Sequence, residues 1–200
     1  MFPRLFLVSI LVLASATLRA QESQKSDAPF GLTWGMSSRD AKSHGIELTE
    51  APYKEYGKSF IARKLRAVIA DTETIVLSFG RDDKLWRIVA VSRDYTFDPY
   101  GTAVKARYQE LLDTLGEKYG KGKSHHQADR KYWKAANEFV MGIKAGMTHW
   151  FTDYDTPAMT IEIGIIASSP DEANWRIIFE DKDLHAAFER STKSKDKKAL

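Results

Sequence analysis

The sequence of 200 residues contains no cysteine. This absence excludes disulfide bonds, a cysteine nucleophile, cysteine metal ligands and a lipid-bearing N-terminal thiol. The chain also has no uninterrupted apolar run of the about 20 residues that a membrane-spanning helix requires. It further lacks a serine between two correctly spaced glycines, so the nucleophile elbow of many hydrolases is missing.

One shorter apolar run is present near the start of the chain. Arg4 precedes the apolar residues 5–13, and the small residues Ala14, Ser15 and Ala16 follow. This order is typical of a secretory signal peptide. We predict a signal peptide over residues 1–20 with cleavage after Ala20, and cleavage after Ala16 as the alternative. A cysteine-free exported chain fits a bacterial periplasm best, because 180 residues can bury one core without disulfides.

The formal net charge of +3 comes from the ends of the chain. Residues 21–190 carry 24 basic and 26 acidic residues, whereas residues 191–200 carry four lysines and one aspartate. A slightly acidic domain argues against nucleic-acid binding, which relies on neutralising phosphates. We predict a disordered basic tail over 191–200, either solubilising or in weak contact with anionic membrane at about 1 kcal/mol per lysine.

Periodicity in the first half predicts strands and one short helix. Alternation predicts a strand at 30–34, and Ser37 with Asp40 has capping-box spacing at the start of a helix that ends near Gly45. A strand is predicted at 60–69. The clearest hairpin joins Ile75, Leu77 and Phe79, through a turn at 80–84, to a strand at 85–91 with Leu85, Val89 and Val91 on one face.

The second half begins with the clearest helix, over 102–119. Its apolar stripe has helical spacing and comprises Val104, Tyr108, Leu111, Leu112, Leu115 and Tyr119. A loop at 121–129 and a second helix from Tyr132 to about Gly146 follow. Strands are predicted at 147–154, at 159–167 and around Trp175, Ile177 and Phe179, before a short helix that includes Leu184 and Phe188.

This order predicts an α+β fold, as a single domain with a mainly antiparallel sheet and helices packed on one face. The predicted organisation is a signal peptide at 1–20, a polar leader at 21–29, the α+β domain at 30–190 and the basic tail at 191–200.

The segment Phe30-Gly31-Leu32-Thr33-Trp34-Gly35-Met36-Ser37 resembles the opening of a group of small exported proteins of Gram-negative bacteria. Their members begin Phe-Gly-Leu-x-Trp-Gly-Met-Ser after a signal peptide and have no established activity. The resemblance implies a periplasmic location and assigns no function. The Gly-Met-Ser entry to a helix is also similar in architecture to outer-membrane assembly lipoproteins and β-lactamase-inhibitor-like domains, whose cysteines this chain lacks.

Two groups of residues have a metal-like composition. They are His125 and His126 with Asp129, and His149 with Asp153 and Asp155. Adjacent side chains point apart in an extended segment, and we expect the second group to mix both faces of its strand. We therefore expect loop histidines and turn aspartates, with no metal and no cofactor.

Other residues with catalytic or ligand-binding potential have simpler structural interpretations. Asp153, Asp155 and Glu162 could form a carboxylate pair for hydrolysis, although Asp155 before Thr156-Pro157 is typical of a turn. Glycines and lysines at 116–123 follow a helix rather than precede one, so they do not form a phosphate loop. We expect the five tryptophans to pack in the core and not to stack on a bound glycan. They are Trp34, Trp86, Trp133, Trp150 and Trp175.

No catalytic, cofactor or metal residue is therefore assigned. The leading hypothesis is an exported, non-catalytic domain that binds another envelope protein through an exposed sheet face or edge. The alternatives are an envelope hydrolase that uses the acidic residues of segment 149–162, and an immunity-type inhibitor.

Overall fold

The structure is a computed structural model that describes residues 26–128 and 135–199. The signal-peptide prediction, Asp129 and Trp133 lie outside these residues. The strands are β1 (Asp27–Ala28), β2 (Leu32–Thr33), β3 (Glu47–Glu50), β4 (Lys58–Arg63), β5 (Thr72–Phe79), β6 (Leu85–Ser92), β7 (Lys123–Ala128), β8 (Thr148–Asp155), β9 (Met159–Ser169) and β10 (Glu172–Asp181). The helices are η1 (Pro29–Gly31), α1 (Ser38–Ser43), α2 (Thr102–Tyr119), η2 (Ala136–Glu138), α3 (Phe139–Lys144) and α4 (Lys182–Ala199).

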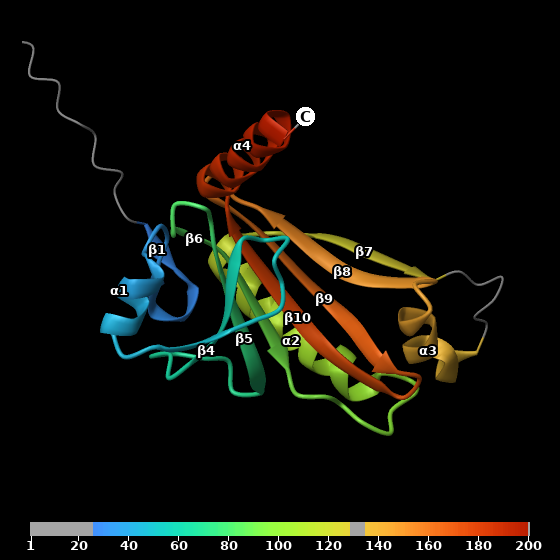
Figure 1. Cartoon of the computed structure of the whole chain (residues 1–200). Coiled ribbons are helices and arrows are strands. Elements are labelled where there is room, and N and C mark those ends of the chain that lie inside the picture. The colour runs from blue at the N-terminus through green and yellow to red at the C-terminus, as the bar shows by residue number, and fades with distance from the viewer. Residues whose placement is uncertain (1–25, 129–134, 200) are drawn as a thin grey trace, which may run out of the picture.

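Eight of these strands form one antiparallel sheet in the order β3-β4-β5-β6-β10-β9-β8-β7 (Figure 1). Hairpins connect most neighbours, but β6 and β10 pair although more than 70 residues separate them in the chain. The prediction of a single α+β domain with an antiparallel sheet is confirmed.

The main core lies between the sheet and α2. Val104, Tyr108, Leu111 and Leu115 of α2 are buried, as the helical spacing predicted. They pack with the buried face of the central strands, to which Trp175, Ile177 and Phe179 belong. Burial of this continuous apolar surface is the main stabilising contribution to the fold.

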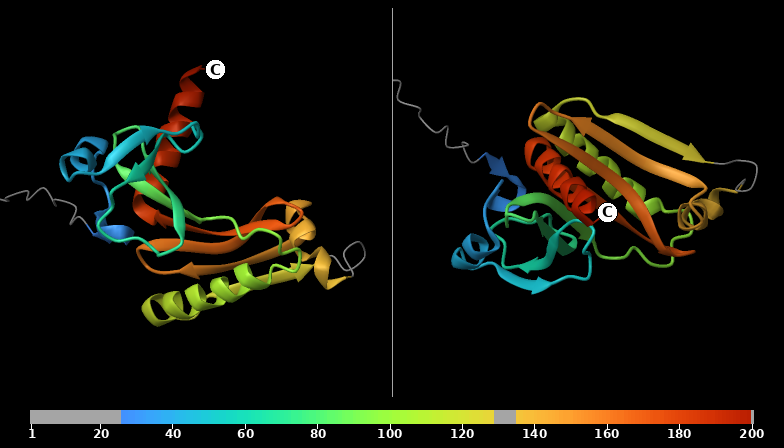
Figure 2. Two further views of the ribbon diagram at one scale, coloured as in Figure 1. Left: turned by 90° about the horizontal axis from the view of Figure 1, so that it is seen from below. Right: turned by 45° about the horizontal axis from the view of Figure 1, so that its top comes forward.

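Three of the described α-helices contribute buried side chains to this core, whereas α4 lies mainly outside it. Side chains of α1, α2 and α3 all belong to the main core cluster, through Ala41, Val104 and Val140. In both views of Figure 2, α4 lies on the opposite side of the sheet from α2 and projects away from it. His185 and Phe188 of its first turns stack against Trp86, with ring centroids 4.7 and 4.9 Å away.

The start of the domain agrees in part with its prediction. Ser37 and Asp40 form the expected capping box, with hydrogen bonds of 3.0 and 3.1 Å between side chains and backbone amides. The predicted strand at 30–34 is reduced to the two residues of β2, because Phe30 and Gly31 both have positive φ angles.

The hairpin of β5 and β6 is confirmed, but one prediction about its faces is wrong. The pairing register shifts between Ser78 and Phe79, so one extra residue is accommodated at the start of β6. Such a bulge changes the face on which the following side chains lie. Leu85 therefore joins the main core, whereas Val89 and Val91 lie on the opposite face.

Three boundary predictions are corrected. The strand predicted at 60–69 ends at Arg63, because Lys64 has a left-handed φ of 60°. The loop predicted at 121–129 contains β7, whose residues do not alternate because this edge strand is largely exposed on both faces. The second predicted helix is confined to η2 and α3 within the described chain, from residue 136 onward.

The tail at 191–200 was predicted to be disordered, but α4 extends through it to Ala199. Starting an isolated helix is unfavourable, whereas adding residues to an existing helix is not. The packed first turns of α4 remove the starting cost. Lysine and alanine are good helix formers, which favours continuation.

Candidate functional site

Among the described helices, α4 packs on the face of the sheet opposite α2 through its first turns only, and then projects away from it (Figure 2). We call this face of the sheet the open face. A small apolar cluster lies there, formed by Ala51, Ile61, Val76, Val89, Val91 and Ile178. Cross-strand pairing of Val76 with Val89, and of Val89 with Ile178, makes this cluster continuous across three strands.

The loop between β3 and β4, residues 51–57, forms a wall at one side of this cluster. The Arg87 guanidinium lies 3.9 Å from the centroid of the Tyr56 ring, and Trp86 Nε1 donates a 3.2 Å hydrogen bond to the Tyr56 carbonyl. The loop is thus held at Tyr56, whereas the neighbouring Tyr53 remains 49% exposed.

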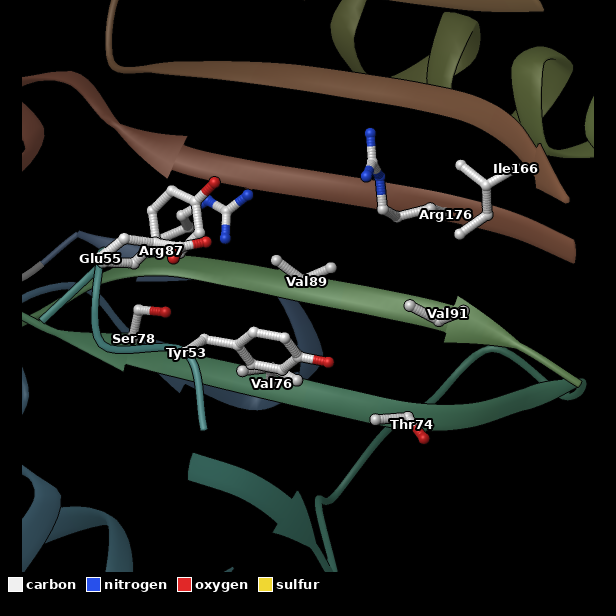
Figure 3. Close-up of a pocket in the computed structure, with 11 residues that line it drawn as sticks. Tyr53, Glu55, Thr74, Val76, Ser78, Arg87, Val89, Val91, Ile166 and Arg176 are labelled. Carbon is white, nitrogen blue, oxygen red and sulfur yellow. The ribbon is translucent and has the colours of Figure 1, made fainter. Parts of the chain in front are cut away.

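A pocket of about 320 Å³ lies between this wall and β10. Its floor consists of Val76, Val89 and Val91. Figure 3 shows Tyr53 and Arg176 on opposite sides of Val89 and Val91. A concave apolar surface with a few polar groups at its rim is the usual form of a binding site.

The two arginines of the pocket differ in their hydrogen bonding. Arg87 Nε donates a 2.8 Å hydrogen bond to Glu180, and both side chains are mostly buried. Arg176 Nη2 donates to Glu162 at 2.9 Å, but its Nε–H is buried without a partner within the described residues. Arg176 therefore keeps unused donor capacity at the edge of the pocket.

The acidic segment 149–162 also lies on the open face, and one expectation about it is wrong. His149, Asp153 and Asp155 share one face of β8, because their even spacing matches the strand period of two. Asp153 pairs across strands with Glu162. With Glu180 they line a pocket of about 260 Å³.

Each of these carboxylates has a basic side chain beside it. Asp153 lies 3.2 Å from His125 Nε2, and Asp155 contacts the Lys182 ammonium. Glu162 binds Arg176 as described above. The acidic side chains of this segment are therefore paired with basic side chains and do not form an unpaired couple of carboxylates.

The histidines do not gather around a common point. His125 stacks on Phe151 of the open face, whereas His126 on the other face stacks on Trp150 at 4.0 Å. Burial and the neighbouring His125 lower the pKa of His126. Within the described residues no group of three potential metal ligands occurs.

A partly buried polar network surrounds Asp71, the residue before β5. Its Oδ2 accepts hydrogen bonds from the Tyr95 hydroxyl at 2.6 Å and Trp175 Nε1 at 2.7 Å, and its Oδ1 accepts two from Arg107. Burial alone would raise the pKa of Asp71, but these donors outweigh it and lower the pKa to about 2. Burial and the adjacent carboxylate raise the pKa of Tyr95 to about 12. These hydrogen bonds connect the residue before β5 with α2, β10 and the loop after β6.

For the described residues, the glycines and lysines at 116–123 lie at the end of a helix and the tryptophans are buried or half-buried, as predicted. Gly120 ends α2 with φ 84°, and the lysines around it follow the helix. Trp34, Trp86 and Trp175 are buried, and Trp150 is half-buried against His126.

Comparison with known proteins gives no match to any protein-family model, curated protein or solved structure. The resemblance of the 30–37 segment thus stays a prediction. None of the helices in the described chain has the length and apolar character needed to cross a membrane.

Proposed function

We propose that the mature chain is a periplasmic binding domain without catalytic activity, and that its open face holds a segment of another envelope protein. The pocket over Val76, Val89 and Val91 is the observation that carries this proposal. Tyrosine and arginine, the residue types at its rim, are enriched at protein interfaces and among the residues that dominate binding energy.

The size and setting of the pocket favour a protein segment as its occupant. Its volume of about 320 Å³ is at the lower end of the roughly 300–1,000 Å³ typical of small-molecule sites. It also opens onto a broad sheet surface rather than closing around a ligand. A partner segment could place one apolar side chain against the valine floor and offer a carbonyl or carboxylate oxygen as acceptor to Arg176.

The location of the protein gives a first prediction. If residues 1–20 form a signal peptide, protein isolated from the periplasm of a bacterial host begins at Gln21. Intact mass and N-terminal sequencing after cell fractionation measure this. Retention of Met1 on protein embedded in the membrane would contradict export by a cleaved signal.

A second prediction concerns Tyr53. Truncation of an aromatic interface anchor commonly costs about 2 kcal/mol or more, so Tyr53→Ala should weaken capture of the partner from periplasmic extract at least tenfold. Arg176→Gln should act in the same direction. Capture on immobilised mature protein, followed by mass spectrometry and titration of the identified partner, measures the effect.

The matched control is Tyr100→Ala. Tyr100 is 51% exposed, which closely matches Tyr53, but it lies outside the open face in the loop after β6. Partner affinity should be unchanged by this variant, and urea denaturation should show all three variants folded. Equal affinity for wild type, Tyr53→Ala and Arg176→Gln would show that the open face is not the binding surface.

One observation supports the envelope hydrolase as a second candidate. Asp153 and Glu162 are cross-strand neighbours beside a pocket that also contains Asp155. Under the binding proposal, Asp153→Asn and Asp155→Asn, which keep the Glu162–Arg176 pair in place, leave partner capture and any envelope phenotype of the wild-type protein intact. Loss of that phenotype in both folded variants would favour the hydrolase. A toxin as the captured partner would instead identify an immunity-type inhibitor.

A further inference from the structure

A second hollow, which shares the 51–57 loop with the open-face pocket, lies at the base of α4. It has a volume of about 500 Å³ and forms where the 51–57 loop, the turn between β5 and β6, and α4 meet. Its basic lining residues are Lys54, Lys58 and Arg81, and Phe188 and Thr192 line it from α4.

Positive charge predominates in this hollow. Lys54, Lys58 and Arg81 are exposed, and none of them forms an ion pair with another described residue. Two carboxylates, Glu55 and Asp83, also line the hollow. Asp83 already accepts hydrogen bonds from the backbone amide and hydroxyl of Ser38, at 3.2 and 3.0 Å. Three cations are therefore left with one uncommitted carboxylate.

Close packing fixes the frame that presents these cations. Gly57 has a φ of +89°, and a Cβ at this position would lie 2.3 Å from the Phe79 carbonyl oxygen. Only glycine lets the loop approach β5 so closely. On the other side Phe188 stacks on Trp86 with an interplanar angle of 18°. The base of α4 is thereby held against the loop that carries Lys54 and leads into β4 at Lys58.

From this hollow α4 extends the positive surface outward. The helix has 18 residues and hence a length of about 27 Å, and it projects from the body of the protein (Figures 1 and 2). Arg190, Lys193 and Lys197 have the i, i+3, i+7 spacing of one helix face. Beyond Thr192 the helix is almost without apolar residues, so its outer half offers charge rather than a surface that inserts into lipid.

We propose that this basic end, comprising Lys54, Lys58, Arg81, Arg190, Lys193 and Lys197, docks the protein on an anionic phospholipid surface. The cations are distributed over a hollow and a projecting helix, so one small anion cannot contact them all, whereas a layer of lipid phosphates can. Each basic residue near such a surface strengthens binding by roughly fivefold. The hollow shares the 51–57 loop with the open-face pocket, but its basic residues do not line that pocket, and lipid docking does not rest on the function proposed for the open face.

The test uses the full mature chain in co-sedimentation with vesicles. Binding to vesicles that contain phosphatidylglycerol is expected at about 0.05 M salt and should weaken strongly at about 0.5 M, where surface charges are screened. Vesicles of phosphatidylcholine alone should bind little. The triple variant Lys54→Gln/Lys58→Gln/Arg81→Gln should lose at least tenfold in affinity, as should Lys193→Gln combined with Lys197→Gln.

The matched control is Arg63→Gln/Arg66→Gln/Lys144→Gln. These exposed cations also form no ion pair within the described chain, and Arg63 lies at the opposite end of β4 from Lys58. Retained binding by this control supports docking through the basic end. An equal loss of vesicle affinity in both triple variants would show that only the net charge of the protein matters, which would overturn the proposal. Absence of wild-type binding would also overturn it.

Titration with inorganic phosphate tests whether the basic residues bind a free phosphate ion instead of the phosphates of a lipid surface. Phosphate at millimolar concentration should neither raise the thermal midpoint nor displace the protein from vesicles beyond the effect of matched ionic strength. If phosphate did both, the hollow would be a site for a small anion and not a membrane-docking surface. Neither result alters the expected effect of Tyr53→Ala on capture of a protein partner.

Discussion

Leu111→Ala should lower the free energy of unfolding by about 2–5 kcal/mol, because it removes buried apolar surface and leaves a cavity. Leu111 is 6% exposed and lies in the main core, where α2 packs against β9 and β10. Such a loss is a large part of the roughly 5–15 kcal/mol typical of a domain. Urea denaturation measures it, and Leu115→Ala should give a similar result.

Glu117→Ala is the control on the same helix. Glu117 is exposed and has no ion pair within the described residues, whereas Glu110 accepts a 2.6 Å hydrogen bond from Arg107. The free energy of unfolding should change by less than about 0.5 kcal/mol in this variant. Equal stability of Leu111→Ala and Glu117→Ala would mean that the stripe of α2 does not pack in the core.

Asp71→Ala should destabilise the protein by about 1.5–3 kcal/mol at neutral pH, because it removes a partly buried carboxylate that accepts hydrogen bonds from Arg107 and leaves Arg107 only its exposed partner Glu110. The Tyr95 hydroxyl and Trp175 Nε1 also lose their acceptor. Urea denaturation measures the effect. Glu73→Ala, two residues away at an exposed position, should be nearly neutral.

The same carboxylate should make stability depend on pH. The pKa of Asp71 is about 2 in the folded protein, against 3.8 for an ordinary aspartate. Because the folded value is the lower one, the stabilisation is fully present above about pH 4 and is lost as the pH falls toward 2. The Asp71 side chain is only 14% exposed, and the contribution is about 2 kcal/mol.

The advantage of wild type over Asp71→Ala should therefore shrink by about this amount between pH 5 and pH 2. The Glu73→Ala variant should follow wild type across the range. A constant difference between wild type and Asp71→Ala at all pH values would show that Asp71 stabilises the fold without its charge.

The open face left only a weak signal in the sequence. Residues 88–91 of β6 are all apolar, and a strand that is apolar on both faces is usually buried on both. The alternation of Leu85, Val89 and Val91 obscured this signal, because a bulge at the start of β6 places Leu85 on the other face. Tyr53 and Arg176, at the rim of the pocket, lie in segments whose local pattern gives no reason to bring them together.

The acidic segment 149–162 was singled out from its composition, and the structure shows why composition was insufficient. Asp153 and Glu162 are neighbours on paired strands, but each lies beside a basic side chain from a further strand, His125 of β7 or Arg176 of β10. Such partners depend on strand order, which local periodicity does not specify.

By itself the sequence determined the elements whose patterns are local. The stripe of α2, the β5–β6 hairpin and the capping box of α1 each arise from spacings of a few residues, because helix and strand periods are properties of the backbone. The α+β class follows from their order. Only the tertiary structure decided that β6 lies beside β10. That pairing depends on packing between residues far apart in the chain, and it creates the open-face pocket by setting Val89 and Val91 of β6 beside Arg176 of β10.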